Sequence, residues 1–206
     1  MATCVRPPSL TSISKVDCAV QFNQLQRLGF VRMPPVGTPL FATEAAMKEK
    51  DAWVPLLEAS DDTKLVITPF FVNHIIPPGE GTFAEENTNA SLGGAGYFTG
   101  QNGVRPTGEF LGLPSDVYEQ LLPIIDESAA ELGLARMGLY AFNLKGEIIS
   151  RGVNPIPFLN FFTGDPGSGG LNTKNIHNFS YSLQPGWYKG VTLLKPNFDP
   201  RIDLDA

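Results

Sequence analysis

A long polar excursion that follows an apolar strand constrains this chain more than any other feature of its sequence. Residues 65–76 are rich in β-branched and aromatic side chains, which predicts a strand. Two prolines and Gly79 then end it, because proline donates no hydrogen bond to a sheet. From Gly79 to Gly112 the chain is rich in Gly, Asn, Thr and Glu. Since a structureless loop of this length is rare in a compact domain, we interpret residues 77–113 as an assembly arm that lies against a partner.

The few large apolar side chains of this arm are the candidates for contact with the partner. They are Phe83, Leu92, Tyr97, Phe98, Val104, Phe110 and Leu111. Aromatic side chains carry much of the binding energy where two chains meet. We therefore predict that four aromatic residues of the arm form a subunit interface, and we expect the partner to be a neighbouring copy: Phe83, Tyr97, Phe98 and Phe110.

The glycine and proline content favours many strands and turns over a helical bundle. The chain has 21 Gly and 18 Pro in 206 residues, well above the ordinary usage of about 12% for the two together. Its 14 Phe supply a hydrophobic core, so the composition is not that of a disordered chain. We expect a mainly β (α+β) fold in a single domain, 1–206, with an N-terminal arm at 1–15 and a polar C-terminal tail at 196–206.

The first half of the chain predicts two short strands and one short helix before the arm. Apolar residues alternate partly between Val16 and Met33, with a break near Asn23. Thr43 is placed to cap a helix over residues 44–50, whose first turn is acidic. We expect Trp53 and the apolar residues after it to form the buried end of this segment.

The second half predicts one long helix and a series of hairpins. An apolar stripe runs from Ser115 to Leu132, with Ser115 or Asp116 as the N-cap and Pro123 as a kink or a division. Lys145-Gly146 predicts a tight turn between two strands, and residues 155–163 predict another strand. We also expect a final hairpin that joins residues 176–183 to 187–194 through Gln184-Pro185-Gly186.

The charge pattern argues against nucleic-acid binding, and the short apolar runs argue against membrane insertion. The net charge is −6 with a pI near 4.9, and the 15 Lys and Arg residues form no run. The longest apolar runs are far shorter than a membrane span, and the N-terminus lacks a signal-peptide core, so we expect synthesis in the cytoplasm. Cys4 and Cys18 are then more consistent with free thiols than with a disulfide.

The sequence offers no convincing catalytic, cofactor or metal site. Gly93-Gly94-Ala95-Gly96 lacks the spacing of a dinucleotide-binding loop, and no Gly-Lys-Ser/Thr occurs. Ser168 follows Asp165 in an order that does not match a hydrolase nucleophile loop. We therefore expect a protein that is not an enzyme, with no cofactor and no metal.

The two histidines and the C-terminal aspartates have structural interpretations. His74 lies among apolar residues of a strand, which favours a packed or interface position, and His177 begins a strand beside asparagines, which favours the surface. Catalysis by either would need a pocket that joins it to a carboxylate. Asp199, Asp203 and Asp205 have the chemistry for calcium but lack the glycine turn of an EF-hand.

Four segments resemble the tail tube proteins of tailed bacteriophages, most closely those of phages that infect Bacteroidota. They are ITPFFVNHIIPPGE, TGQNGVRPTGEF, PIPFLNFFTGD and SLQPGWYKGVTLLKPNFDPRIDL. The resemblance implies a β-sandwich or barrel with one main helix and a long extended loop. It also implies rings, typically hexameric, that stack into the DNA-conducting channel of the virion tail, with the long loop of one subunit docked on its neighbours.

The resemblance implies partners as well as a shape. These are copies of the chain itself, other tail or neck proteins, and a genome that passes through without specific binding. Residues 43–62 have no counterpart in that family. A capsid decoration, neck or tail terminator protein, each acting as a binding module, is the alternative.

Overall fold

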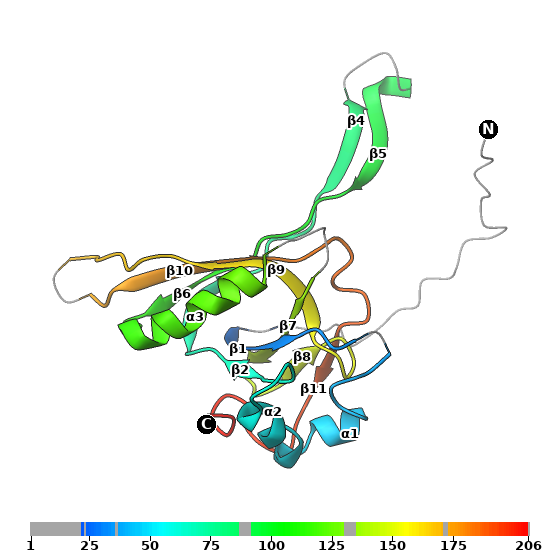
Figure 1. Ribbon diagram of the computed structural model, residues 1–206. Coiled ribbons are helices and arrows are strands. Elements are labelled where there is room, and N and C mark those ends of the chain that lie inside the picture. The colour runs from blue at the N-terminus through cyan, green and yellow to red at the C-terminus, as the bar shows by residue number, and fades with distance from the viewer. Residues whose placement is uncertain are drawn as a thin grey trace.

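The computed structural model describes residues 22, 24–35, 37–86, 92–129, 135–170 and 173–205, and in them the fold is mainly β (Figure 1). The strands are β1 (Leu25–Arg32), β2 (Val66–Ile67), β3 (Phe71–Ile75), β4 (Gly81–Glu86), β5 (Ala95–Gln101), β6 (Thr107–Leu111), β7 (Met137–Asn143), β8 (Ile148–Ser150), β9 (Ile156–Thr163), β10 (Ile176–Ser182) and β11 (Thr192–Leu194). The helices are α1 (Glu44–Met47), α2 (Val54–Glu58) and α3 (Ser115–Glu127), with 3₁₀ turns η1 (Lys50–Ala52) and η2 (Leu92–Gly94). The predicted N-terminal arm, both cysteines and residues 16–21 lie outside the described residues.

Of the described strands, nine form one antiparallel sheet, and β4 and β5 form a separate pair. The large sheet has two halves that share β9. The first half contains β2, β1, β7, β8 and β11, and the second half contains β10, β6 and β3. The N-terminal part of β9 pairs with β7 (Met137 opposite Phe158), and its C-terminal part pairs with β10 (Phe179 opposite Thr163).

A bend at Asn160 lets β9 pass from one half of the sheet to the other. Asn160 has a φ of 51°, which is the left-handed region, and asparagine tolerates it better than most residues. Ser128, just after α3, accepts two hydrogen bonds that hold the bend: Asn160 N–H donates to the Ser128 carbonyl (2.7 Å), and Phe161 N–H donates to its hydroxyl (2.8 Å). Strands that bend between sheets in this way make the corners of a sandwich, so the two halves enclose a common core.

The core between the two halves is rich in aromatic rings. Phe30 of β1 packs on Phe161 with ring centroids 5.0 Å apart, and Phe110 of β6 stacks on Phe179 at 4.6 Å. Leu121 and Ile124 of α3 join this cluster. This buried cluster is the main hydrophobic contribution to the stability of the domain.

A second core covers the outer face of the first half-sheet. It is built from α1, η1 and α2, and it places Trp53 against Tyr140 and Phe142 of β7. Trp53 is fully buried, and its indole N–H donates to the Met47 carbonyl (2.9 Å). Every residue of β7 is therefore buried, because both faces of this strand are covered.

Several predicted elements are confirmed and several are wrong. The Thr43 cap is confirmed, since its hydroxyl accepts from Ala46 N–H (3.1 Å), although α1 ends at Met47. The turn at Lys145-Gly146 joins β7 to β8 as expected. The N-cap of α3 is Pro114, with no side-chain cap bond, so the predicted Ser115 or Asp116 cap is wrong.

The predicted final hairpin is wrong because both of its strands pair with distant segments. Strand β10 lies between β9 and β6, and β11 pairs with β8. Likewise the apolar stretch at 65–76 is divided into β2, which pairs with β1, and β3, which pairs with β6. Long-range pairings of this kind decide strand partners here, rather than the nearest turn.

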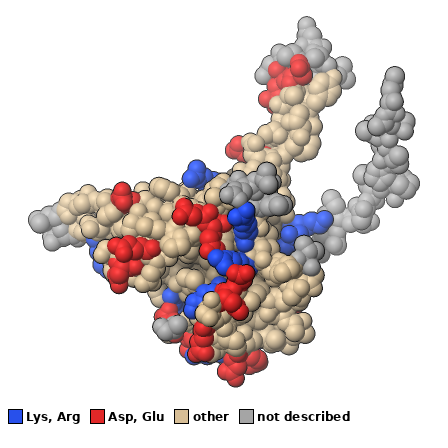
Figure 2. Space-filling model, in the orientation of Figure 1, with Lys and Arg blue, Asp and Glu red and all other residues tan. Residues whose placement is uncertain are grey.

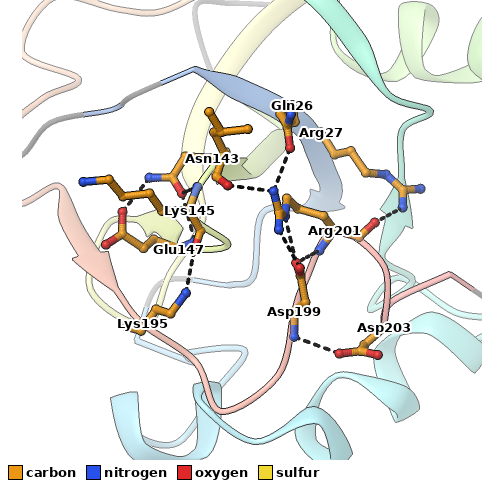
Figure 3. Close-up of polar contacts among 10 residues, drawn as sticks. Gln26, Arg27, Asn143, Lys145, Glu147, Lys195, Asp199, Arg201 and Asp203 are labelled. Atoms are coloured by element: carbon orange, nitrogen blue, oxygen red, sulfur yellow. Dashed lines mark hydrogen bonds and ion pairs between the residues drawn. The ribbon is translucent and has the colours of Figure 1, made fainter.

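The C-terminal segment is fixed to the body and is not a loose tail. Arg201 forms a bidentate ion pair with Asp199 and also donates to the Gln26 amide oxygen (3.0 Å) and the Leu144 carbonyl (2.7 Å) (Figure 3). The buried Arg27 donates to the Arg201 carbonyl (2.6 Å) and forms an ion pair with Asp205. This network connects residues 199–205 to β1 and to the β7–β8 turn.

Candidate assembly surface

The predicted assembly arm is a β-hairpin that projects from the body, with β4 and β5 side by side (Figure 1). Most of the long loop expected over residues 77–113 therefore consists of strands, which are β4, β5 and, at its end, β6. The arm continues the antiparallel pair formed by β3 and β6, which are its neighbours in sequence on either side. At its root, Val104 and Leu183 exchange backbone hydrogen bonds of 3.0 and 2.8 Å, so the arm leaves the body from a fixed base.

Three of the four predicted interface residues lie on this hairpin and are exposed. Phe83 and Phe98 are directly opposite one another, with ring centroids 5.7 Å apart in an edge-to-face arrangement. Phe83 is 50% exposed, Phe98 is 68% exposed and Tyr97 is 55% exposed. Successive residues of a strand point to opposite faces, so Phe98 and Tyr97 place an aromatic ring on each face of the ribbon.

Phe110 does not belong to this surface. It lies on β6, is 1% exposed and packs between Phe71 and Phe179 in the main core. The prediction that Phe110 is an interface anchor is therefore corrected: the chain has already returned to the body at residue 104. Alternation along a strand sends Gly108 and Phe110 inward and Glu109 outward.

The hairpin has little to stabilise it by itself. A two-stranded ribbon is at best marginally stable in water unless a third strand or another surface covers one face. Here β4 and β5 pair only with each other among the described strands, and their large side chains face solvent. The arm therefore has the physical properties of a segment that is completed by contact with another surface.

The arm is also acidic. Glu80, Glu85 and Glu86 lie on it, and the sequence has no Lys or Arg between residues 77 and 104. Figure 2 shows acidic side chains on the arm in the face that is in view. A surface that receives the arm should therefore avoid carboxylates.

Exposed apolar residues also occur on the outer face of the second half-sheet, which the sequence interpretation missed. Ile75 is 62% exposed and Phe162 is 50% exposed. The available signal was the alternation in residues 155–163, where Phe161 is buried and Phe162 is exposed. Arg105 lies in the same region and donates to the Ser180 hydroxyl (3.0 Å).

The histidines occupy packed positions. His74 stacks near Phe179 and Tyr181, and its Nε2 lies 3.0 Å from the Tyr181 hydroxyl. Burial lowers the pKa of His74 to about 4, so it is neutral at physiological pH. His177 is 3% exposed, which corrects the prediction of a surface position, and its Nδ1 lies 3.1 Å from the Gly164 carbonyl oxygen.

Asp165 and the C-terminal aspartates have partners of their own. The Tyr118 hydroxyl donates to Asp165 (3.2 Å) while its ring packs against His177, so the tyrosine adjoins both groups. Asp199 pairs with Arg201, and Asp203 accepts from the Asp199 N–H (2.8 Å). Within the described residues, no group of three or more His, Cys, Asp or Glu is arranged to hold a metal ion.

Two further findings bear on the surroundings of the protein. Among the helices that the structure describes, none is both long and apolar enough to cross a membrane. No protein-family model, no curated protein and no solved structure matches this chain.

Proposed function

We propose that this protein is a structural subunit that assembles into stacked rings, the tail tube of a tailed bacteriophage. The observation that carries the proposal is the β4–β5 arm, which exposes Phe83, Tyr97 and Phe98 on a ribbon with which no other described strand pairs. Aromatic residues of this kind are typical of the energetic centre of protein interfaces. The segments that resemble tail tube proteins support the same function.

The geometry of the arm favours an open or ring-forming assembly over a two-fold dimer. A projecting arm that docks on a different part of the next subunit makes a heterologous contact, and such contacts either close into rings or continue as filaments. Strand β3 adds a second opportunity, because among the described strands it pairs only with β6. Its other edge is able to accept a strand from a neighbour.

The charge of the chain suits a channel for DNA. A net charge of −6 repels phosphates, so a wall made of many copies would let DNA pass without holding it. In this proposal the protein is made in the host cytoplasm and resides in the virion tail, where it contacts its own copies and other tail or neck proteins. It performs no enzymatic reaction and binds no cofactor.

Electron microscopy of the purified protein at increasing concentration tests the proposal. We expect stacked rings or hollow tubes from the wild-type chain, and a folded monomer from the double variant Tyr97→Ala, Phe98→Ala. Phe162→Ala is the matched control, because Phe162 is equally an exposed aromatic residue (50%) but lies outside the arm. If the double variant forms the same tubes as the wild type, the aromatic residues of the arm are not needed for assembly.

A tail terminator, neck or capsid decoration protein is the second candidate. The helical cover of α1, η1 and α2 favours it, because residues 43–62 have no counterpart in the tail tube family that the chain resembles. This function predicts single rings that do not stack, or discrete particles whose size is independent of concentration. The same images therefore separate the two candidates.

A further inference from the structure

An arm that docks on a neighbour requires an acceptor on the body, and three open grooves lined by described residues can be compared. The first lies between α3 and β1, beside Arg32. The second lies on the outer face of the second half-sheet, beside Arg105. The third, which we call the proline groove, is lined by Pro34, Pro35, Pro39, Pro155 and Pro157, with Arg151 at its margin.

Charge separates the three grooves. The groove beside Arg32 contains Lys64 but also three carboxylates, those of Asp61, Asp62 and Glu127, and Arg32 is already paired with two of them. In the groove on the half-sheet, Arg105 is balanced by Glu109. The proline groove has a single charged lining residue among those described, Arg151, so it alone of the three carries a net positive charge.

We propose that the proline groove of one subunit receives the acidic aromatic arm of a second copy of this chain. This inference rests on the proposed self-assembly and names the surface that completes it. The groove has a volume of about 530 Å³, and Pro35 and Pro39 at its wall are exposed. The arm supplies Phe98 as the apolar group and Glu86 as the charge opposite Arg151.

Proline and aromatic side chains are complementary partners. Proline-rich segments and aromatic surfaces recognise each other in many peptide complexes, because the fixed proline backbone loses little entropy when it is covered. Here the prolines come from the β1–α1 connection and from the start of β9, which lie beside one another on the body. The groove is therefore largely preorganised, while the arm is the partner that gains order.

The contact joins different parts of two molecules. The arm leaves the body between β3 and β6 and points away from it (Figure 1). The groove lies next to the first half-sheet, because its lining includes Pro155 and Pro157 at the start of β9, which pairs with β7. An arm-to-groove contact is heterologous, so each subunit has one arm to give and one groove to fill. Repetition of that contact produces a ring or a filament, as the proposed function requires.

Charge reversal tests the contact directly. Sedimentation velocity would measure the concentration at which half of the protein is assembled, for the wild type, Arg151→Glu, Glu86→Arg and the double variant. We expect each single variant to need at least about tenfold more protein and the double variant to recover most of the loss, because opposite charges are restored. Arg105→Glu, the same change in the balanced groove, is the matched control and should assemble like the wild type.

Photo-crosslinking gives a second readout that does not depend on charge. A photoreactive phenylalanine analogue at position 98 should crosslink to peptides that contain residues 33–39 or 151–157 of another copy. Crosslinks to residues 59–66 or to α3 would overturn the proposal, as would normal assembly of Arg151→Glu. A wild-type chain that stays monomeric at every concentration would refute the proposed self-assembly itself, whereas wild-type assembly without sensitivity at Arg151 would refute only the groove.

Discussion

His74 should make the stability of this protein depend on pH between neutral and acidic conditions. Its imidazole is packed beside Phe71, Phe179 and Tyr181 in the second half-sheet, and burial lowers its pKa from 6.5 to about 4. The neutral ring is favoured in the folded state, while the unfolded chain takes up a proton near the ordinary pKa. Between these two values the unfolded state binds more protons, so a fall in pH favours unfolding.

The size of the effect follows from the two pKa values. The contribution of the neutral His74 ring to the free energy of unfolding is fully present well above pH 6.5. It declines as the pH falls from 6.5 to about 4, and it changes no further well below pH 4. Linkage gives a loss of about 2 kcal/mol between pH 8 and pH 5, and about 3 kcal/mol once the pH is well below 4. This is a large fraction of the 5–15 kcal/mol by which domains are usually stable.

Urea unfolding at pH 8, 6 and 5 measures this loss when the wild type is compared with His74→Gln. Glutamine does not titrate, and its amide retains the capacity to hydrogen-bond Tyr181. Carboxylates with lowered pKa values, such as Asp199 beside Arg201, also make the protein less stable in acid. They are present in the wild type and in the variant, so their contribution cancels when the two unfolding free energies are subtracted. We expect the wild type to lose about 2 kcal/mol more than the variant between pH 8 and pH 5.

Two results would refute the reasoning. One is an equal decline in the wild type and His74→Gln. The other comes from an NMR titration of the folded wild type, which needs no variant: a His74 pKa near 6.5 would show that burial does not hold the ring neutral. Either result would mean that solvent reaches the space between β3 and Tyr181.

Three further predictions concern the core, the arm and the C-terminal network. Gly108→Ala should destabilise the fold by about 1–3 kcal/mol in urea unfolding, because the added Cβ would lie 2.4 Å from the Phe179 ring; unchanged stability would mean that this ring moves freely. Phe110→Ala should cost about 3–5 kcal/mol while Phe98→Ala changes the stability of the monomer by less than about 0.5 kcal/mol, since one ring is buried and the other exposed; similar losses would contradict this placement. Arg201→Ala should increase proteolysis of the C-terminal residues and lower stability by about 1.5–3 kcal/mol, because it removes the bonds to Gln26 and Leu144; equal protease resistance would show that the other contacts suffice.

Local signals in the sequence were sufficient where neighbouring residues decide the structure. The turn at Lys145-Gly146 follows from glycine, which has a φ of 68° there. The cap at Thr43 follows from a side chain that reaches an amide three residues away. The mainly β fold and the aromatic residues of the arm were visible for the same reason, because composition and isolated apolar residues are properties of short segments.

The tertiary structure decided what depends on residues far apart in the sequence. The sequence of residues 77–113 does not show where the arm ends and the body begins. The pairing of β6 with β10 decides this, because it places Phe110 in the core, whereas Phe98 on the arm stays exposed. His177 is buried because α3 supplies Tyr118 beside it. The bend at Asn160 depends on Ser128, 32 residues earlier, and no local pattern specifies that contact. The sequence by itself determined which segments are apolar and where the chain turns. The long-range pairing of strands determined which of those segments face the core, because the position of a strand in the sheet depends on the strands it pairs with and not on the residues next to it in the sequence.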